Sequence, residues 1–319
     1  MPPAHAPARH LPFVPAAAFV LVWSSGYISG PAAVRASAPF FTLGWRFALA
    51  ALLGTLVALA LRRPWRLTRQ DVGRVVGVGL MMNGLQFGLI YVAFDLGLGA
   101  TISSLLHALS PVLTAILAAL LVQERISWVQ VLGFVLGVVG VLVVLGPDLG
   151  HVGGPVAVLL GALSMLTLSL GTLGQRWIGG TPDLLWSTVV QFAVSAPPLL
   201  LLSWTFEGAW PVTDPVVAGV SLGLLALVNS LVGLGLLALL VLRGGSGAAS
   251  SLFFLSPPVT AVLAWLILDE TMGARELVGL AIAVVGVAAA TRVRRSSAPS
   301  SAASSPGRPR ALPRTPRSP

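Results

Sequence analysis

The sequence contains no cysteine, and only 9% of its 319 residues are charged. Without cysteine, disulfide bonds and thiolate metal sites are excluded. The sequence also has no cluster of metal ligands and no phosphate-binding loop, so we expect neither a metal nor a cofactor. In their place stand 56% hydrophobic residues and a mean hydropathy of +0.92, more apolar surface than a soluble domain of this length can bury. The composition therefore predicts an integral membrane protein.

Apolar stretches of roughly 17–25 residues, the length that crosses the hydrocarbon core as a helix, occur ten times. They cover residues 12–30, 41–61, 75–95, 100–122, 128–146, 154–173, 184–204, 216–242, 248–268 and 274–291. The connections are short and leave no room for a soluble domain. Residues 1–11 and the Ser/Pro/Ala/Arg-rich tail 292–319 have little to bury, so we expect both to be disordered. The predicted fold is an all-α membrane protein of ten transmembrane helices.

The orientation follows from the arginines, because cytoplasmic loops retain positive charge. If the N-terminus is cytoplasmic, the outer loops hold only Arg35 and Arg275, whereas Arg62, Arg69, Arg243 and the arginine-rich tail all lie inside. We therefore expect both termini in the cytoplasm. The net charge of +9 then marks one face of the membrane, and no nucleic-acid partner is expected.

A repeat with a constant offset runs through the chain. Leu109–Pro111 matches Leu255–Pro257, and Asn83 matches Asn229, each pair separated by 146 residues. The two halves are residues 12–146 and 147–291. Because each half has five spans, an odd number, the two copies must cross the membrane in opposite directions. This is the inverted-repeat plan of secondary transporters, whose substrate site lies near the midplane between the halves.

At these residues the chain resembles the EamA-type branch of the drug/metabolite transporter superfamily. The resemblance is strongest from Leu109 through Glu124 to Gly140 and at the equivalent positions of the second half, and it extends to Trp23–Ser25 and Arg46. It implies a ten-helix carrier of the bacterial-type inner membrane, often an exporter of amino acids, other metabolites or drugs. It also implies a monomer, with a small molecule and the lipid bilayer as its partners.

Candidate substrate contacts are polar and aromatic side chains set inside apolar spans. They are Trp23, Ser24, Arg46, Asn83, Gln86, Tyr91, Ser103, His107, Gln191, Asn229 and Phe253. Arg46 either binds an anionic group of the substrate or snorkels to the interface. His107 is either a neutral packing residue or a cavity residue that binds substrate or exchanges a proton. Gln191 stands where the first half has Arg46, and Phe253 where it has His107, so the cavity is not chemically symmetric.

Three prolines, Pro111, Pro257 and Pro258, lie inside predicted spans, where proline removes a helical hydrogen bond and bends the axis. They are candidates either for the cavity wall or for a structural or hinge role. Glu124 and Glu270, at the ends of two spans, either contact loops and helix ends or couple transport to protons. Glycines such as Gly133 and those at corresponding places in the second half favour close helix packing.

Two short motifs suggest an intramembrane enzyme instead. Gly219–Gly223 fits a nucleophile elbow but lies within an apolar span. Gly244–Gly247 resembles the serine motif of rhomboid-type proteases, but all four histidines precede it, whereas the base of that family follows it. A passive channel or a membrane sensor is the other alternative, and it fits the duplication less well. The sequence thus predicts a secondary transporter, not an enzyme, that works by alternating access around a midplane cavity.

Overall fold

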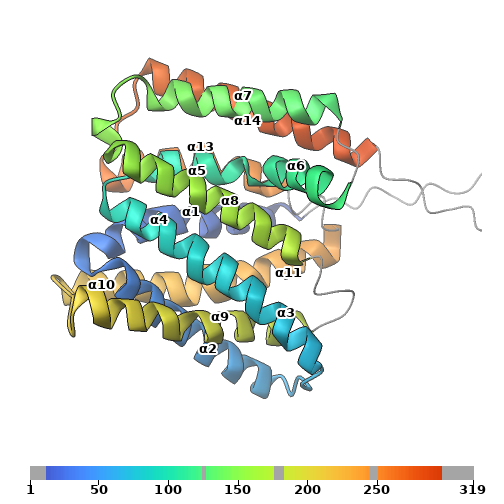
Figure 1. The fold of residues 1–319 in the computed structure, drawn as a ribbon, viewed down its shortest axis with the longest axis vertical. Coiled ribbons are helices and arrows are strands. Elements are labelled where there is room, and N and C mark those ends of the chain that lie inside the picture. The colour runs from blue at the N-terminus through green and yellow to red at the C-terminus, as the bar shows by residue number, and fades with distance from the viewer. Residues whose placement is uncertain (1–11, 124–126, 176–182, 245–250, 297–319) are drawn as a thin grey trace, which may run out of the picture.

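The computed structural model describes residues 12–123, 127–175, 183–244 and 251–296, which form a bundle of helices (Figure 1). The first half contains α1 (Phe13–Ala36), α2 (Pro39–Ala60), α3 (Arg69–Gly79), η1 (Leu80–Leu85), α4 (Gln86–Asp95), α5 (Ala100–Ala108), α6 (Ser110–Val122) and α7 (Trp128–Leu145). The second contains η2 (Gly150–Val152), α8 (Gly154–Gln175), α9 (Leu184–Leu202), η4 (Ser203–Glu207), α10 (Pro215–Gly223), η5 (Leu224–Val232), α11 (Gly233–Gly244), η6 (Ser251–Leu255), α13 (Ser256–Leu268) and α14 (Ala274–Ser296). Within the described ranges, β structure is limited to an isolated bridge between Ser37 and Val212. The predicted all-α architecture is confirmed.

Eight helical stretches of the described residues are long and apolar enough to cross a membrane, and Leu252–Leu268 is a shorter apolar helix. The chain is therefore a multi-pass membrane protein. The last predicted span coincides with α14, which continues to Ser296 instead of ending at 291. Residues 292–296 are thus helical, whereas the rest of the predicted tail and residues 1–11 lie outside the described residues.

Polar residues at the ends of the bundle fix where several of these helices begin. At α3, the Thr68 hydroxyl accepts a hydrogen bond from the Asp71 amide and the Asp71 carboxylate accepts one from the Thr68 amide. Ser127 and Gln130 make the same reciprocal pair at the start of α7. Each pair satisfies backbone N–H groups that the first helical turn leaves without partners.

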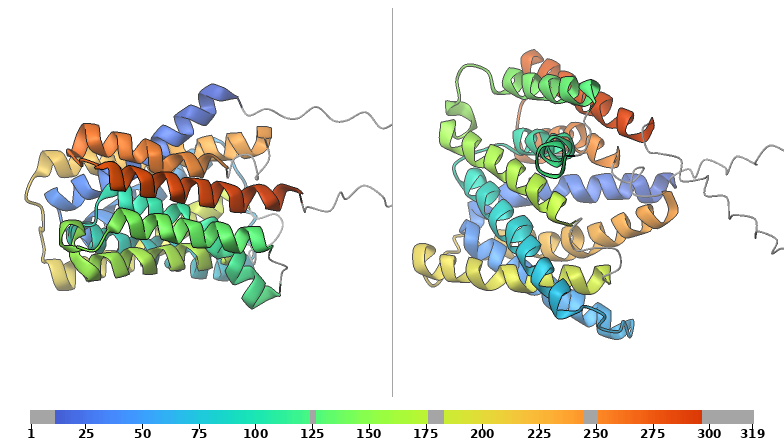
Figure 2. Two further views of the ribbon diagram at one scale, coloured as in Figure 1. Left: turned by 90° about the horizontal axis from the view of Figure 1, so that it is seen from above. Right: turned by 45° about the vertical axis from the view of Figure 1, so that its right-hand side comes forward.

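The helices lie side by side across the bundle (Figure 1). Helices α7 and α14 form one edge, α2, α9 and α10 form the opposite edge, and α1, α4, α5, α8 and α13 lie between them. The start of α1 and the end of α14 lie at the same end of the bundle (Figure 2). A chain whose two ends lie on the same side of the membrane crosses it an even number of times.

Glycine brings α7 and α14 into backbone contact. A Cβ built on Gly133 would lie 2.5 Å from the carbonyl oxygen of Gly286, and one built on Gly140 would lie 2.6 Å from the carbonyl oxygen of Gly279. Real Cβ atoms do not approach other atoms so closely, so only glycine permits this separation of the two axes. The predicted packing role of these glycines is confirmed.

Both halves interrupt a helix at the same point of the repeat. Helix α5 ends at Ala108 and α6 starts at Ser110, while η6 ends at Leu255 and α13 starts at Ser256. The prolines that follow therefore occupy the first turn of a new helix, where a missing N–H costs nothing. The sequence predicted a bend within a continuous span. The interruption is confined to a single turn, because Leu109 and Leu255 keep right-handed helical backbone angles and Ala100–Leu121 still forms one membrane-length stretch.

Two carboxylates tie helix ends together at the end of the bundle that holds the 207–214 connection. Glu207 accepts hydrogen bonds from the backbone amides of Phe40 and Phe41, both at 2.8 Å, at the start of α2. Glu270 accepts one from the amide of Ala100 at 2.8 Å and others from the amide and hydroxyl of Thr101, at the start of α5. A negative charge at a helix N-terminus is stabilising. Glu270 thus contacts a helix end, as one of its two predicted roles requires, whereas Glu124 lies outside the described residues.

Candidate functional site

The Arg46 side chain points into the bundle and is only 7% exposed. Its Nη1 donates to the Tyr91 hydroxyl at 3.1 Å, and its Nε makes a longer contact of 3.4 Å with the Ser230 hydroxyl. The guanidinium carbon lies 4.6 Å from the centre of the Phe87 ring, which is cation–π distance. Within the described residues no carboxylate pairs with this cation. We call Arg46, Tyr91, Phe87 and Ser230 the arginine cluster.

A second polar group, the histidine cluster, consists of Tyr27, Gln86, His107 and Ser164. His107 Nε2 lies 2.8 Å from the Ser164 hydroxyl, and His107 Nδ1 lies 3.0 Å from the Tyr27 hydroxyl. The Gln86 amide nitrogen donates to Ser164 at 3.2 Å. Which ring nitrogen of His107 carries the proton decides the direction of its hydrogen bonds with Ser164 and Tyr27.

The Gln86 side chain has a hydrogen-bond acceptor without a partner among the described residues. Its Oε1 is buried and finds no hydrogen-bond partner among the described residues. A buried carbonyl oxygen without a partner is uncommon and calls for an explanation, such as a ligand group that the site receives. This oxygen makes Gln86 a candidate for contact with an N–H or O–H of the substrate.

An aromatic cluster occupies the position that the repeat assigns to the histidine cluster in the other half. Phe253 is the counterpart of His107, and Phe19 is that of Ser164 at an offset of 145. The ring of Phe253 packs edge-on against Trp23 at 4.8 Å and against Phe19 at 5.2 Å between centroids. The polar contact of one half is thus replaced by aromatic packing in the other.

Helices α1 and α4 join the two polar clusters. Gln86 and Tyr91 both belong to α4, and Tyr27 lies on α1 one turn before Gly30. A Cβ built on Gly30 would lie 3.6 Å from the Tyr91 hydroxyl, so α1 passes directly over the arginine cluster as well. The two clusters therefore belong to one polar region in the centre of the bundle.

Widened helical turns position part of this region. The amide of Gln86 bonds the carbonyl of Met81 at the end of η1, and the amide of Gly233 bonds that of Val228 at the end of η5. These i→i+5 bonds form π-helical turns, which occur often at functional sites. In η5, Ser230 contacts Arg46, and its neighbour Asn229 donates to the carbonyl of Val22 and to the Ser25 hydroxyl on α1.

The other candidate residues lie apart from these clusters. Ser103 donates to the carbonyl of Gly99 on its own helix, at 2.8 Å. Gln191 accepts a hydrogen bond from the Gln175 amide at 3.2 Å. Asn83 is half-buried, and no side-chain hydrogen bond of it is found within the described ranges. Ser24 bonds Ser256 across the bundle at 3.2 Å.

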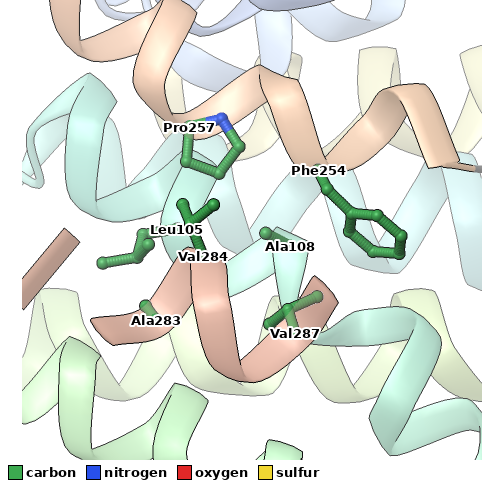
Figure 3. Close-up of a pocket in the computed structure, with 7 residues that line it drawn as sticks. All are labelled: Leu105, Ala108, Phe254, Pro257, Ala283, Val284 and Val287. Carbon is green, nitrogen blue, oxygen red and sulfur yellow. The ribbon is translucent and has the colours of Figure 1, made fainter. Parts of the chain in front are cut away.

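Pro257 lies in a tightly packed apolar contact between η6, α5, α13 and α14 (Figure 3). The contact is formed by Leu105, Ala108, Phe254, Pro257, Ala283, Val284 and Val287, and it leaves no space for a water molecule. This environment offers a substrate no polar group, so it favours a packing or hinge role for Pro257.

Sequence reasoning missed several cluster members. Tyr27 carried a signal, because the chain has only two tyrosines and both lie inside apolar spans. Ser230 adjoins the candidate Asn229. The sequence carried no signal for Ser164, Phe19 or Phe87, because single serines and phenylalanines are common in apolar helices. Only the three-dimensional packing shows that these three belong to the clusters.

The known proteins that this chain resembles are described as transporters. The EamA-like transporter family model matches residues 13–146 and again residues 155–292. The uncharacterised transporter YvbV of Bacillus subtilis is 27% identical over 84% of this chain and 87% of its own. A probable amino-acid metabolite efflux pump of Salmonella typhimurium is 25% identical over 84% and 90% of the two chains. An S-adenosylmethionine/S-adenosylhomocysteine transporter of Chlamydia muridarum is 25% identical over 83% and 86%.

A protein of known crystal structure shares the fold, with a TM-score of 0.62 over 89% of this chain and 98% of the other at 20% sequence identity. Together, the two family matches cover nearly all of the helical part of the chain. The chain therefore belongs to the EamA-like transporter family.

Proposed function

We propose that this transporter carries a small metabolite by alternating access between two inverted five-helix repeats, residues 12–146 and 147–291. Ten helices cross the membrane in this proposal: the eight long apolar stretches, the shorter helix Leu252–Leu268 and α14. The substrate binds between the halves, at the arginine and histidine clusters, and the halves rock about this site.

Reciprocal contacts between α7 and α14 carry the proposal. Under the 146-residue offset, Gly133 is equivalent to Gly279 and Gly140 to Gly286. Gly133 packs against Gly286, and Gly140 packs against Gly279. A contact and its exchanged copy in one interface are the mark of two-fold symmetry. Because residue numbers rise along α7 where they fall along α14, the helices are antiparallel, and the axis that relates them lies across the helices, in the plane of the membrane.

Serine pairs elsewhere in the bundle repeat this pattern. Ser24 bonds Ser256 at 3.2 Å, and Ser110 bonds Ser169 at 3.0 Å. Ser256 is the counterpart of Ser110 at an offset of 146, and Ser169 is that of Ser24 at an offset of 145. The same two-fold exchange thus relates α1 and α13 to α8 and α6, which supports the inverted repeat through the body of the protein.

The proposal includes the inner (cell) membrane as location, a cytoplasmic position for both termini, and a functional monomer. The arginine distribution supports the orientation. Exposed tryptophans near helix ends support the membrane boundaries: Trp204 and Trp210 lie between α9 and α10, Trp65 lies between α2 and α3, and Trp128 starts α7. Tryptophan is enriched at both water–lipid interfaces of membrane proteins.

The relatives narrow the substrate to small metabolites, and the efflux pumps among them favour export. Arg46, Gln86, Tyr91 and His107 are the proposed polar contacts. The aromatic cluster around Phe253 is the proposed apolar contact. Five further candidate substrate contacts lie outside the arginine and histidine clusters: Ser24, Asn83, Ser103, Gln191 and Asn229.

Counterflow in proteoliposomes tests the proposal. Vesicles loaded with an unlabelled amino acid or related metabolite should accumulate the labelled compound transiently, with a saturable rate and no chemical conversion. Empty liposomes and the variant His107→Phe, which copies the residue of the second half, serve as controls, and the variant should exchange more slowly. A flux that rises linearly with concentration and shows no counterflow would contradict a carrier and favour a channel.

A further inference from the structure

We infer that the substrate carries a single carboxylate and that Arg46 binds it. This inference rests on the proposed transport function and specifies the substrate class of the same site. The starting point is the depth of the cation. Arg46 lies seven residues after the start of α2 at Pro39, which places its Cα about 10 Å along the helix at 1.5 Å per residue. Its side chain turns into the bundle, not toward the interface, so snorkelling does not account for it.

The neighbours of Arg46 leave its charge uncompensated. Tyr91 and Ser230 are neutral and engage two of the five N–H groups. A buried cation without a counter-ion is unfavourable in a medium of low dielectric constant, so membrane proteins pair such groups or use them for function. The remaining N–H groups can accept a planar carboxylate in the bidentate geometry that guanidinium favours.

The carboxylates of the described residues are engaged elsewhere or lie at the ends of the bundle. Glu207 and Glu270 bind the N-termini of α2 and α5. Glu276 pairs with Arg275. No internal counter-ion for Arg46 is therefore found in the described part of the chain, and the complementary charge must come from a ligand.

The ring of Phe87 sets the geometry of this site. It lies against the guanidinium at 4.6 Å, and that of Phe47 lies at 5.4 Å. The guanidinium carbon lies over both ring faces, and the N–H groups that are not bonded to Tyr91 or Ser230 stay available to a ligand. Tyr91 then holds one corner of the guanidinium and fixes the direction from which the carboxylate enters.

The amount of positive charge selects a carboxylate over a phosphate. Among the described residues, Arg46 is the one charged side chain that is buried. Its counterpart Gln191 is neutral and bonds Gln175. One positive charge balances a monoanion, whereas a phosphate monoester at neutral pH carries nearly two negative charges. The second half therefore adds no second anion site.

Pairs of acids and their amides test the inference, because the two members of each pair differ in charge and hardly in shape. The probes are acetate and acetamide, benzoate and benzamide, and N-acetylleucine and N-acetylleucinamide, with phenylphosphonate as the more negatively charged probe. The measurement is the apparent thermal stability of the purified protein in lipid nanodiscs over a concentration series, because a ligand that binds only the folded state stabilises it. Four proteins are compared: the wild type, R46Q, R46K and R275Q. R275Q is the matched control, since it removes the same charge from an exposed site that is paired with Glu276.

We expect at least one acid to stabilise the wild type and R275Q at concentrations at least 10-fold below its amide and below phenylphosphonate. R46Q should lose this preference, and R46K should retain part of it. The inference is overturned if no acid outperforms its amide in the wild type, or if the preference persists in R46Q. If R46Q does not fold, two results still test the inference. These are the preference of the wild type for acids over amides, and the weaker preference expected of R46K than of R275Q. Equal counterflow by the wild type and R46Q would refute the carboxylate contact and leave transport standing, whereas absence of counterflow in the wild type would refute transport itself.

Discussion

Replacing Gly140 by alanine tests the contact between α7 and α14 directly. The added Cβ would lie 2.5 Å from the backbone nitrogen of Ala283 and 2.6 Å from both the Ala283 Cβ and the carbonyl oxygen of Gly279. None of these atoms can rotate away, because all belong to the backbone or are attached to it. The two helix axes must therefore separate by about 1 Å to restore van der Waals distance.

The structure also sets the size of the effect. Overpacking of this kind costs roughly 1–3 kcal/mol, and alanine recovers up to about 1 kcal/mol through its higher helix propensity. We expect a net loss of about 1–2 kcal/mol in the free energy of unfolding. Gly137→Ala, in the same helix, is the matched control, because its new Cβ meets the end of the flexible Leu109 side chain. That variant should stay within about 0.5 kcal/mol of the wild type.

The assay is SDS titration of the protein in dodecyl maltoside micelles, followed by far-ultraviolet circular dichroism. A double variant with Gly279→Ala extends the test, since the two glycines face each other and their effects should not add. If Gly140→Ala is as stable as Gly137→Ala, the backbones of α7 and α14 are not in contact. The main support for the two-fold relation between the halves would then be lost.

Three further predictions concern topology, the carboxylate ties and the helix breaks. Because the chain has no native cysteine, a cysteine at Asp214 should react with an impermeant maleimide added outside intact cells and one at Arg243 should not, and the reverse pattern would contradict the orientation. Glu270→Gln removes the negative charge from the start of α5 and should cost about 1–2 kcal/mol of unfolding free energy, measured by the same SDS titration; a loss below 0.3 kcal/mol, roughly the smallest helix-terminus effect, would show that the contact is incidental. Alanine at Pro111, at its counterpart Pro257 and at the adjacent Pro258 should restore regular helix at the interrupted turns and lower the counterflow rate while substrate still binds, and an unchanged rate would show that the interruptions serve packing alone.

The sequence predicted the helical segments well because hydropathy and length suffice to recognise membrane helices. It also located the repeat, since residues such as Leu109–Pro111 and Leu255–Pro257 recur at a fixed offset. It predicted a distortion at Pro111 but not its exact form, the single interrupted turn at Leu109, because that form depends on neighbouring helices. It did not predict the π-helical turns, which depend on tertiary contacts such as that of Ser230 with Arg46.

The site was only partly predictable for a similar reason. Polar residues inside apolar spans mark candidates, and Arg46, Tyr91, Gln86 and His107 do come together in the centre of the bundle. Their partners depend on distances between helices that no local pattern encodes. Tyr27 meets His107 across 80 residues of chain. Ser103 also lies inside an apolar span, but its hydroxyl donates to the carbonyl of Gly99 in its own helix, so it does not join either cluster.

The glycine contact between α7 and α14 has a consequence for how the protein is made. Helix α7 enters the membrane when residues up to Leu145 have been synthesised, but its partner ends at Ser296, the last described residue. Until then, the glycine face of α7 is covered by lipid or by the insertion machinery. Completion of the bundle therefore waits for the last helix, and a chain that ends before Ala274 lacks the edge that α7 and α14 form together.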